Sequence, residues 1–210
     1  MNINPAIIAI VEGDGEFDAV PALLRRVLWE RLCRYDISAK KPKAAGGKPD
    51  LLKRFEKFLE YALIEGCDAI IVLVDADQEC PFGKAPELAG RAAALNLNVP
   101  VAIVYARSEY ETWFISSLSK GTGEPIRSRL GISASVIAPE DVEEIRSAKG
   151  WLEHHMPNDR GYKETEDQAA LTHYIDLDLA HSRSRSFRRF CHAVDELVNA
   201  IDNGSQAVTP

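Results

Sequence analysis

The sequence has few of the residues that build zinc sites, disulfide frameworks or membrane spans. Its four cysteines, Cys33, Cys67, Cys80 and Cys191, are scattered without close pairs, which argues against a zinc site and against disulfide bonds. No apolar run is long enough to cross a bilayer, and the N-terminus lacks the pattern of a secretion signal. We therefore expect a cytoplasmic protein that has no membrane partner.

Positive charge is also in short supply. The chain has 25 Lys and Arg against 32 Asp and Glu, which gives a formal net charge of −7. Proteins that hold nucleic acid mainly by neutralising its phosphates are usually basic, so a general sequence-independent coat protein is excluded. An acidic site that binds divalent cations can still attract phosphate locally, and enzymes of that kind are not excluded.

What the sequence does contain is a series of apolar runs separated by helical patterns. Residues 70–74 are wholly apolar, as expected of a strand buried on both faces of a parallel sheet, and residues 6–11 and 99–105 read in the same way. With a short strand at 36–40 and helices between the strands, the order βαβαβαβ predicts an α/β fold. We expect a mostly parallel central sheet of about four strands flanked by helices.

This α/β core is expected to span residues 1–120. The remainder is more polar and more helical, which predicts a helical C-terminal part at 121–203 packed on the core, followed by a flexible tail at 204–210.

Acidic residues stand directly after the predicted strands. Asp75 and Asp77 end the run at 70–74, and Glu12 ends the first strand. Ligands of α/β proteins bind beyond the carboxyl ends of parallel strands. Residues two apart on an extended backbone point to the same side, so Asp75 and Asp77 could share one cation, and Glu12 joins them if the two strands are neighbours.

A single Asp-x-Asp is weak evidence, because many strands end in acidic loops simply where the chain returns to water. The case improves because Glu16 and Glu111 place further acids after the first and fourth strands. Crowded carboxylates repel one another unless protons or a cation compensate, so they predict a metal site. A donor set of oxygen atoms alone favours Mg²⁺ or Mn²⁺ over zinc.

Several segments resemble known families. Val11-Glu12-Gly13-x-x-Glu16 followed by Val74-Asp75-Ala76-Asp77 resembles the Toprim fold of topoisomerases, primases and the overcoming-lysogenization-defect (OLD) nucleases. The chain as a whole resembles the Toprim-related domain of unknown function 4276. That second resemblance is carried by Tyr110-Glu111-Thr112-Trp113-Phe114, Gly161-Tyr162-Lys163-Glu164-Thr165, Gln168 and Ser186-Phe187-Arg188-Arg189-Phe190.

The resemblance implies a divalent-metal phosphoryl-transfer site, and most directly a nuclease. Asp75 and Asp77 would bind one Mg²⁺ or Mn²⁺, while Glu12, with Glu16 and Glu111, would complete the site or hold a second ion. Glu12 could instead act as a general acid or base. Lys163 is a candidate catalytic cation for charge on the phosphoryl oxygens, although an exposed surface lysine is an equally good interpretation.

The expected substrate is nucleic acid, with DNA as its expected form. Arg183, Arg185 and Arg188, with Lys48, are the best candidate contacts to it, although such a charge run is more often a solvated surface. Gly46-Gly47-Lys48 lacks the glycine and Ser/Thr of a P-loop, so ATP binding by this chain is not expected. The resemblance suggests a separately encoded ATPase as partner and a role in antiphage defence.

Two other functions stay open from sequence. The chain could be a non-catalytic partner subunit that keeps the fold and docks another protein. It could also be another Mg²⁺ enzyme with an Asp-x-Asp motif, such as a nucleotide-sugar transferase, although that chemistry does not need Glu12-Gly13 after the first strand. The oligomeric state cannot be read from the sequence.

Overall fold

A computed structural model describes residues 4–210 as an α/β fold built on one parallel sheet. The sheet has six strands in the order β2-β1-β4-β5-β6, and β3 also pairs with β1. The strands are β1 (Ala6–Val11), β2 (Ser38–Ala39), β3 (Lys43–Ala44), β4 (Ala69–Asp75), β5 (Val101–Ala106) and β6 (Val208–Thr209). The predicted α/β class and the mostly parallel, helix-flanked sheet are confirmed.

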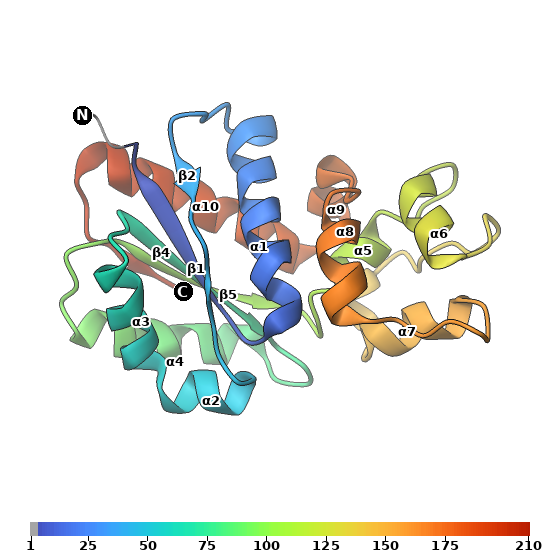
Figure 1. The fold of residues 1–210 in the computed structure, drawn as a ribbon, viewed down its shortest axis with the longest axis horizontal. Helices are drawn as coiled ribbons and strands as arrows, with labels where there is room; N and C mark the ends of the chain where they lie inside the picture. Colours follow the sequence, from blue (N-terminus) through green and yellow to red (C-terminus); the bar gives the residue numbers. More distant parts are fainter. Residues whose placement is uncertain (1–3) are drawn as a thin grey trace.

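The three long strands are apolar on both faces because both faces are covered. Alternate side chains of β1 enter different clusters, with Ile7 on one side of the sheet and Ile8 on the other. Helices α1 (Asp14–Arg26) and α10 (Arg185–Asn203) cover one face, and α2 (Lys48–Lys53), α3 (Phe55–Ile64) and α4 (Pro81–Ala94) cover the other (Figure 1). The core therefore lies in two layers around the central sheet.

The sheet is larger than the four strands predicted from sequence. β3 pairs with the end of β1, within a loop that carries no apolar run. β6 pairs with Val101 and Ala102 of β5, so the expected flexible tail at 204–210 ends in a strand of the sheet. Two-residue strands contain too few side chains to produce a period-2 pattern, and only pairing with a neighbour defines them.

The helical C-terminal part lies beyond the carboxyl ends of β4 and β5, while α10 returns along the sheet (Figure 1). Its elements are α5 (Thr112–Ser116), α6 (Glu124–Leu130), the 3₁₀-helix η2 (Val142–Glu144), α7 (Ala148–His155), the π-helix η3 (Glu164–Gln168), α8 (Ala169–Thr172) and α9 (Leu177–Arg183). A second π-helix, η1 (Val27–Arg31), extends α1. Within residues 4–210, no helix has the length and apolarity that crossing a membrane requires.

Trp113 joins the helical part to α10. Its side chain is fully buried, and its ring centroid lies 5.3 Å from those of both Phe187 and Phe190. Its indole Nε1 donates a hydrogen bond to the Ser186 hydroxyl at 3.1 Å, so the polar end of the ring is satisfied inside the core. Trp113 and its aromatic neighbours thus have a structural role.

We expect Trp113→Ala to lower the free energy of unfolding by about 3–5 kcal/mol, because it leaves a cavity and removes one of the hydrogen bonds of the Ser186 hydroxyl. Urea denaturation followed by far-UV circular dichroism measures this change. The control is Trp29→Ala, whose side chain is 45% exposed, and we expect it to cost about 1 kcal/mol or less. Equal losses for the two variants would contradict the assignment of Trp113 to the core.

Candidate functional site

Carboxylates from two neighbouring strands meet at the carboxyl edge of the sheet. Glu12 directly follows β1, and Asp75 is the last residue of β4. The Asp75 backbone N–H donates to Glu12 Oε1 at 2.6 Å, and the Tyr110 N–H donates to Asp75 Oδ1 at 2.9 Å. The predicted approach of Glu12 to Asp75 is therefore present, and backbone donors fix one oxygen of each carboxylate.

Glu111 brings a third carboxylate from the region after β5. The residue is fully buried, and its Oε1 accepts hydrogen bonds from the Tyr162 hydroxyl at 2.9 Å and from Gln168 Nε2 at 3.4 Å. The same Gln168 amide donates to Glu16 Oε1 at 3.1 Å. Gln168 of the helical part thus links Glu111 to Glu16 of α1, and Tyr162 contacts Glu111 alone.

Some polar atoms at this place have no hydrogen-bond partner within residues 4–210. They include two fully buried oxygens, Glu111 Oε2 and Gln168 Oε1. Glu12 and Asp75 each also keep one carboxylate oxygen that takes part in no hydrogen bond between described residues. Unpaired buried oxygens are costly unless a proton, a water molecule or a cation satisfies them.

Gly15 allows the helical part to approach α1 this closely. A Cβ atom at Gly15 would lie 2.2 Å from Gln168 Oε1 and 3.0 Å from the Cβ of Glu164. Glu16, the next residue, accepts the Gly13 N–H through Oε2 at 3.1 Å and so caps the start of α1. The turn after β1 therefore places both Glu16 and the glycine against η3.

Burial raises the pKa of the three carboxyl groups of the acidic cluster formed by Glu12, Asp75 and Glu111. It raises the pKa of Glu12 to about 7, although the Asp75 N–H and Lys48 oppose the shift. Burial, together with the charges of Glu111 and Glu12, holds the pKa of Asp75 well above its usual range. Burial also raises the pKa of Glu111 to about 7, against the effect of Lys149. Near neutral pH these groups bind protons that isolated carboxylates would have lost.

Asp77 does not lie beside Asp75 in the way the Asp-x-Asp spacing predicts. Its φ is 50°, so the backbone is left-handed there, and the same-side geometry of an extended strand does not apply. The Asp77 carboxylate is instead 2.9 Å from Lys48 Nζ. Lys48 also donates to the Asp75 carbonyl and pairs with Glu79, each at 2.8 Å. Lys48, predicted as a nucleic-acid contact, lies at the rim of the acidic cluster.

Lys163, the predicted catalytic cation, lies outside the cluster. Its side chain is 63% exposed and pairs with Glu166 at 3.0 Å. Lys149 is the lysine whose charge acts on Glu111 and Asp75, and its Nζ pairs with Glu164 at 2.8 Å. Burial alone would lower the pKa of Lys149, but these acids raise it overall.

Sequence reasoning did not select Lys149, Tyr162 or Gln168 as site residues. Tyr162 and Gln168 stand within the segments that carry the family resemblance, so the sequence did mark them as residues of interest. No sequence feature marks Lys149, because nothing in its local pattern distinguishes it from a solvated lysine on a helix.

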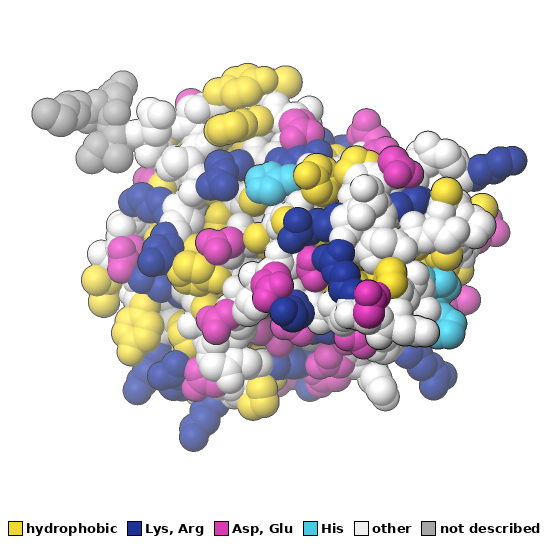
Figure 2. All heavy atoms as spheres, turned by 45° about the vertical axis from the view of Figure 1, so that its right-hand side comes forward, with side chains coloured by type: hydrophobic (Ala, Val, Ile, Leu, Met, Phe, Trp, Pro, Cys, Tyr) yellow, Lys and Arg dark blue, Asp and Glu magenta, His cyan; other side chains and the backbone are white. Residues whose placement is uncertain are grey.

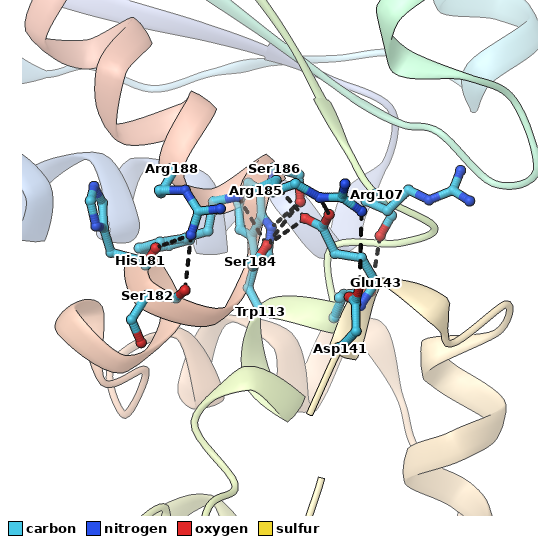
Figure 3. Close-up of polar contacts among 12 residues, drawn as sticks. Arg107, Trp113, Asp141, Glu143, His181, Ser182, Ser184, Arg185, Ser186 and Arg188 are labelled. Carbon is cyan, nitrogen blue, oxygen red and sulfur yellow. Dashed lines mark hydrogen bonds and ion pairs between the residues drawn. The ribbon is translucent and has the colours of Figure 1, made fainter. Parts of the chain in front are cut away.

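The three predicted nucleic-acid-binding arginines do not line the acidic cluster. Arg183 donates to the carbonyls of Ser116 and Pro139, and Arg188 donates to the carbonyls of His181 and Ser182. Figure 3 shows Arg188 directed to the end of α9, while Arg185 lies against Glu143, 2.9 Å away. Arg183 and Arg188 therefore hold the helical part together. Whether any of the three contacts nucleic acid stays a prediction.

The donors fit Mg²⁺ or Mn²⁺ in their chemistry, because they are carboxylate and amide oxygens and Glu111 Oε2 has no partner. They are not already gathered around one point. Within residues 4–210, no group of three or more His, Cys, Asp or Glu side chains is arranged so that it could hold an ion as it stands. Glu12, Asp75 and Glu111 would have to turn their free oxygens toward a shared ion.

The fold and this edge define an α/β protein with an acidic, partly buried site beyond its central strands. A family model described as a domain of unknown function (DUF4276) matches residues 11–195, and the chain belongs to this family. No curated protein and no solved structure matches the chain. The matched range includes Glu12, Asp75 and Glu111 together with the helical part that contacts them.

The raised pKa values predict that the protein loses stability as pH rises. A carboxyl group whose pKa is higher in the folded state than in the unfolded state stabilises the fold when protonated, and that contribution is lost as pH passes from about 4.5 to about 7. Without divalent cations we expect the melting temperature to fall by several degrees between about pH 5 and about pH 8.

Glu12→Gln should flatten this dependence, because the amide oxygen still accepts the Asp75 N–H while the charge is gone. Glu60→Gln is the matched control, since Glu60 is exposed on α3 away from the sheet edge. Differential scanning fluorimetry across the pH range gives both curves. Identical slopes for Glu12→Gln and the unmodified protein would contradict the buried acidic cluster.

Proposed function

We propose that this chain is a Mg²⁺- or Mn²⁺-dependent nuclease that hydrolyses phosphodiester bonds, with DNA as its expected substrate. The observation that carries the proposal is the meeting of Glu12, Asp75 and Glu111, which follow three adjacent parallel strands. Each keeps one oxygen free of hydrogen bonds among the described residues. Asp77 and Glu16 supply further carboxylates at the rim.

In this proposal a bound divalent ion would activate water and stabilise charge on the attacking and leaving oxygens at phosphorus. Hydrogen bonds within the protein orient the three carboxylates. The Tyr110 N–H orients Asp75, the Asp75 N–H orients Glu12, and the Tyr162 hydroxyl orients Glu111. Ordered ligands of this kind lower the cost of assembling a metal site.

Two lysines are placed to balance charge in the same proposal. Lys149 acts on the Glu111 and Asp75 side of the cluster, and Lys48 lies on the Asp77 side. Lys48 is the better candidate for holding a phosphoryl oxygen, because its Nζ lies 2.8 Å from the Asp75 carbonyl, beside a proposed metal ligand. Lys163 is the weaker candidate, because its side chain is exposed and pairs with Glu166.

The resemblance of Val11-Glu12-Gly13-x-x-Glu16 and Val74-Asp75-Ala76-Asp77 to Toprim nucleases supports the same proposal. The wider role that the resemblance suggests, antiphage defence beside a separately encoded ATPase, is part of the proposal and rests on that resemblance alone. Fold-level likeness is a weak guide to activity, so the chemistry has to be tested on the site residues.

The test is to incubate labelled DNA and RNA with the protein in Mg²⁺ or Mn²⁺. We expect cleavage that EDTA abolishes and that Glu12→Gln and Asp75→Asn reduce by about 100-fold or more, since even outer-shell partners of metal ligands contribute about 10- to 100-fold. Glu60→Gln should cleave like the unmodified protein. Cleavage retained by both site variants, or insensitive to EDTA, would overturn the proposal.

A second candidate is a non-catalytic partner subunit that keeps the fold. It is favoured by two observations: the described acidic side chains are not grouped for immediate metal binding, and Lys48 pairs with Asp77. Isothermal titration with Mn²⁺ distinguishes the two candidates. Binding that Asp75→Asn removes favours the enzyme, and absence of binding favours the partner subunit.

A further inference from the structure

An unusually exposed aromatic ring lies next to the carboxyl edge of the sheet. Phe82, in the first turn of α4, is 89% exposed. It lines a groove of about 760 Å³ together with Pro86, Tyr105 and Arg107. The groove also includes Arg185 and Arg189 at the start of α10. Its volume is in the range of sites that hold small organic ligands, about 300–1,000 Å³.

The groove presents positive charge beside this ring. Arg107 donates to the Glu79 carbonyl at 3.1 Å and has no carboxylate within salt-bridge distance among residues 4–210. The Arg185 side chain is 72% exposed, although it pairs with Glu143. Figure 3 shows Arg107 near the pair formed by Arg185 and Glu143, and all three residues line the groove. The remaining acid, Glu79, is paired with Lys48 and Lys84.

Glu79, which lines the groove, connects it to the proposed catalytic edge through a chain of contacts. Lys48 Nζ contacts Asp77 on one side and Glu79 on the other, and the Glu79 carbonyl accepts from Arg107. A polymer that reaches Asp75 and Glu12 past Lys48 can therefore extend toward Arg107 and Phe82. On the face drawn in Figure 2, acidic and basic side chains are interspersed and form no broad basic surface.

We infer that this groove binds an unpaired stretch of nucleic acid, with a base stacked on Phe82 and phosphates at Arg107 and Arg185. This proposal specifies single-stranded nucleic acid as the substrate. It rests on the proposed nuclease function, which places the bond to be cleaved at the acidic edge of the sheet. A base can stack on an exposed aromatic ring only when it is unpaired, and such stacking is tolerant of sequence. A duplex needs many phosphate contacts, and the cations that line the groove are three arginines, Arg107, Arg185 and Arg189.

Fluorescence anisotropy in EDTA tests binding without cleavage. The probes are a labelled single strand of about 12 nucleotides, a length suited to one binding groove, and the blunt duplex formed by that strand and its complement. We expect the full chain to bind the single strand more tightly than the duplex. Phe82→Ala and Arg107→Gln should each weaken single-strand binding by about tenfold and change duplex binding by less than about twofold.

Tyr35→Ala and Lys120→Gln are the matched controls, because they remove an exposed ring and an exposed charge away from the groove. Both should bind like the unmodified protein. Unchanged single-strand binding by Phe82→Ala, equal affinity for strand and duplex, or no binding at all would overturn the inference.

A separate cleavage assay in Mn²⁺, with the unmodified protein and with Asp75→Asn, distinguishes the nuclease proposal from the groove proposal. Binding that depends on Phe82 in a chain that does not cleave refutes only the nuclease, and cleavage with Phe82-independent binding refutes only the groove.

Discussion

The hydrogen bond from the Asp75 N–H to Glu12 Oε1 fixes two acidic residues at adjacent strand ends, and the site depends on it. Parallel pairing of β1 with β4 and of β4 with β5 brings these ends to one edge without any need for long loops. The consequence is electrostatic. Carboxylates held together and away from water must share protons, bind cations or be balanced by donors, and this protein uses backbone N–H groups and two lysines for part of that balance.

The helical part completes this edge rather than forming a separate unit. Tyr162 and Gln168 cover Glu111, and Lys149 supplies the nearest positive charge on that side. The contact is close because Gly15 has no side chain where Gln168 packs. It is made by the π-helix η3, and π-helical turns recur at functional sites. Burial at this contact raises the pKa of Glu111.

The parts of the site that could be read from sequence are those set by strand periodicity. Apolar runs that end in Glu12 and Asp75 identify strand ends, and parallel topology then predicts that the ends meet. Asp77 could not be placed, because its left-handed backbone is a property of the turn rather than of the strand. Lys163 and Lys149 could not be ranked, since helix packing decides which lysine faces the acids. The partners of Arg183 are carbonyl oxygens, which no sequence pattern marks.

Protons and divalent cations compete for the same oxygens in this arrangement. Because the pKa of Glu12 and that of Glu111 are both about 7, a cation that binds near neutral pH displaces protons, and its apparent affinity rises with pH. Under the proposed function, the same competition would let an acidic chain accept an anionic substrate. Protonated or metal-bound carboxyls repel phosphate far less than free carboxylates do, and Lys48 and Arg107 supply the attraction at the rim. Local charge at the edge, rather than the net charge of the chain, therefore decides whether phosphate can approach.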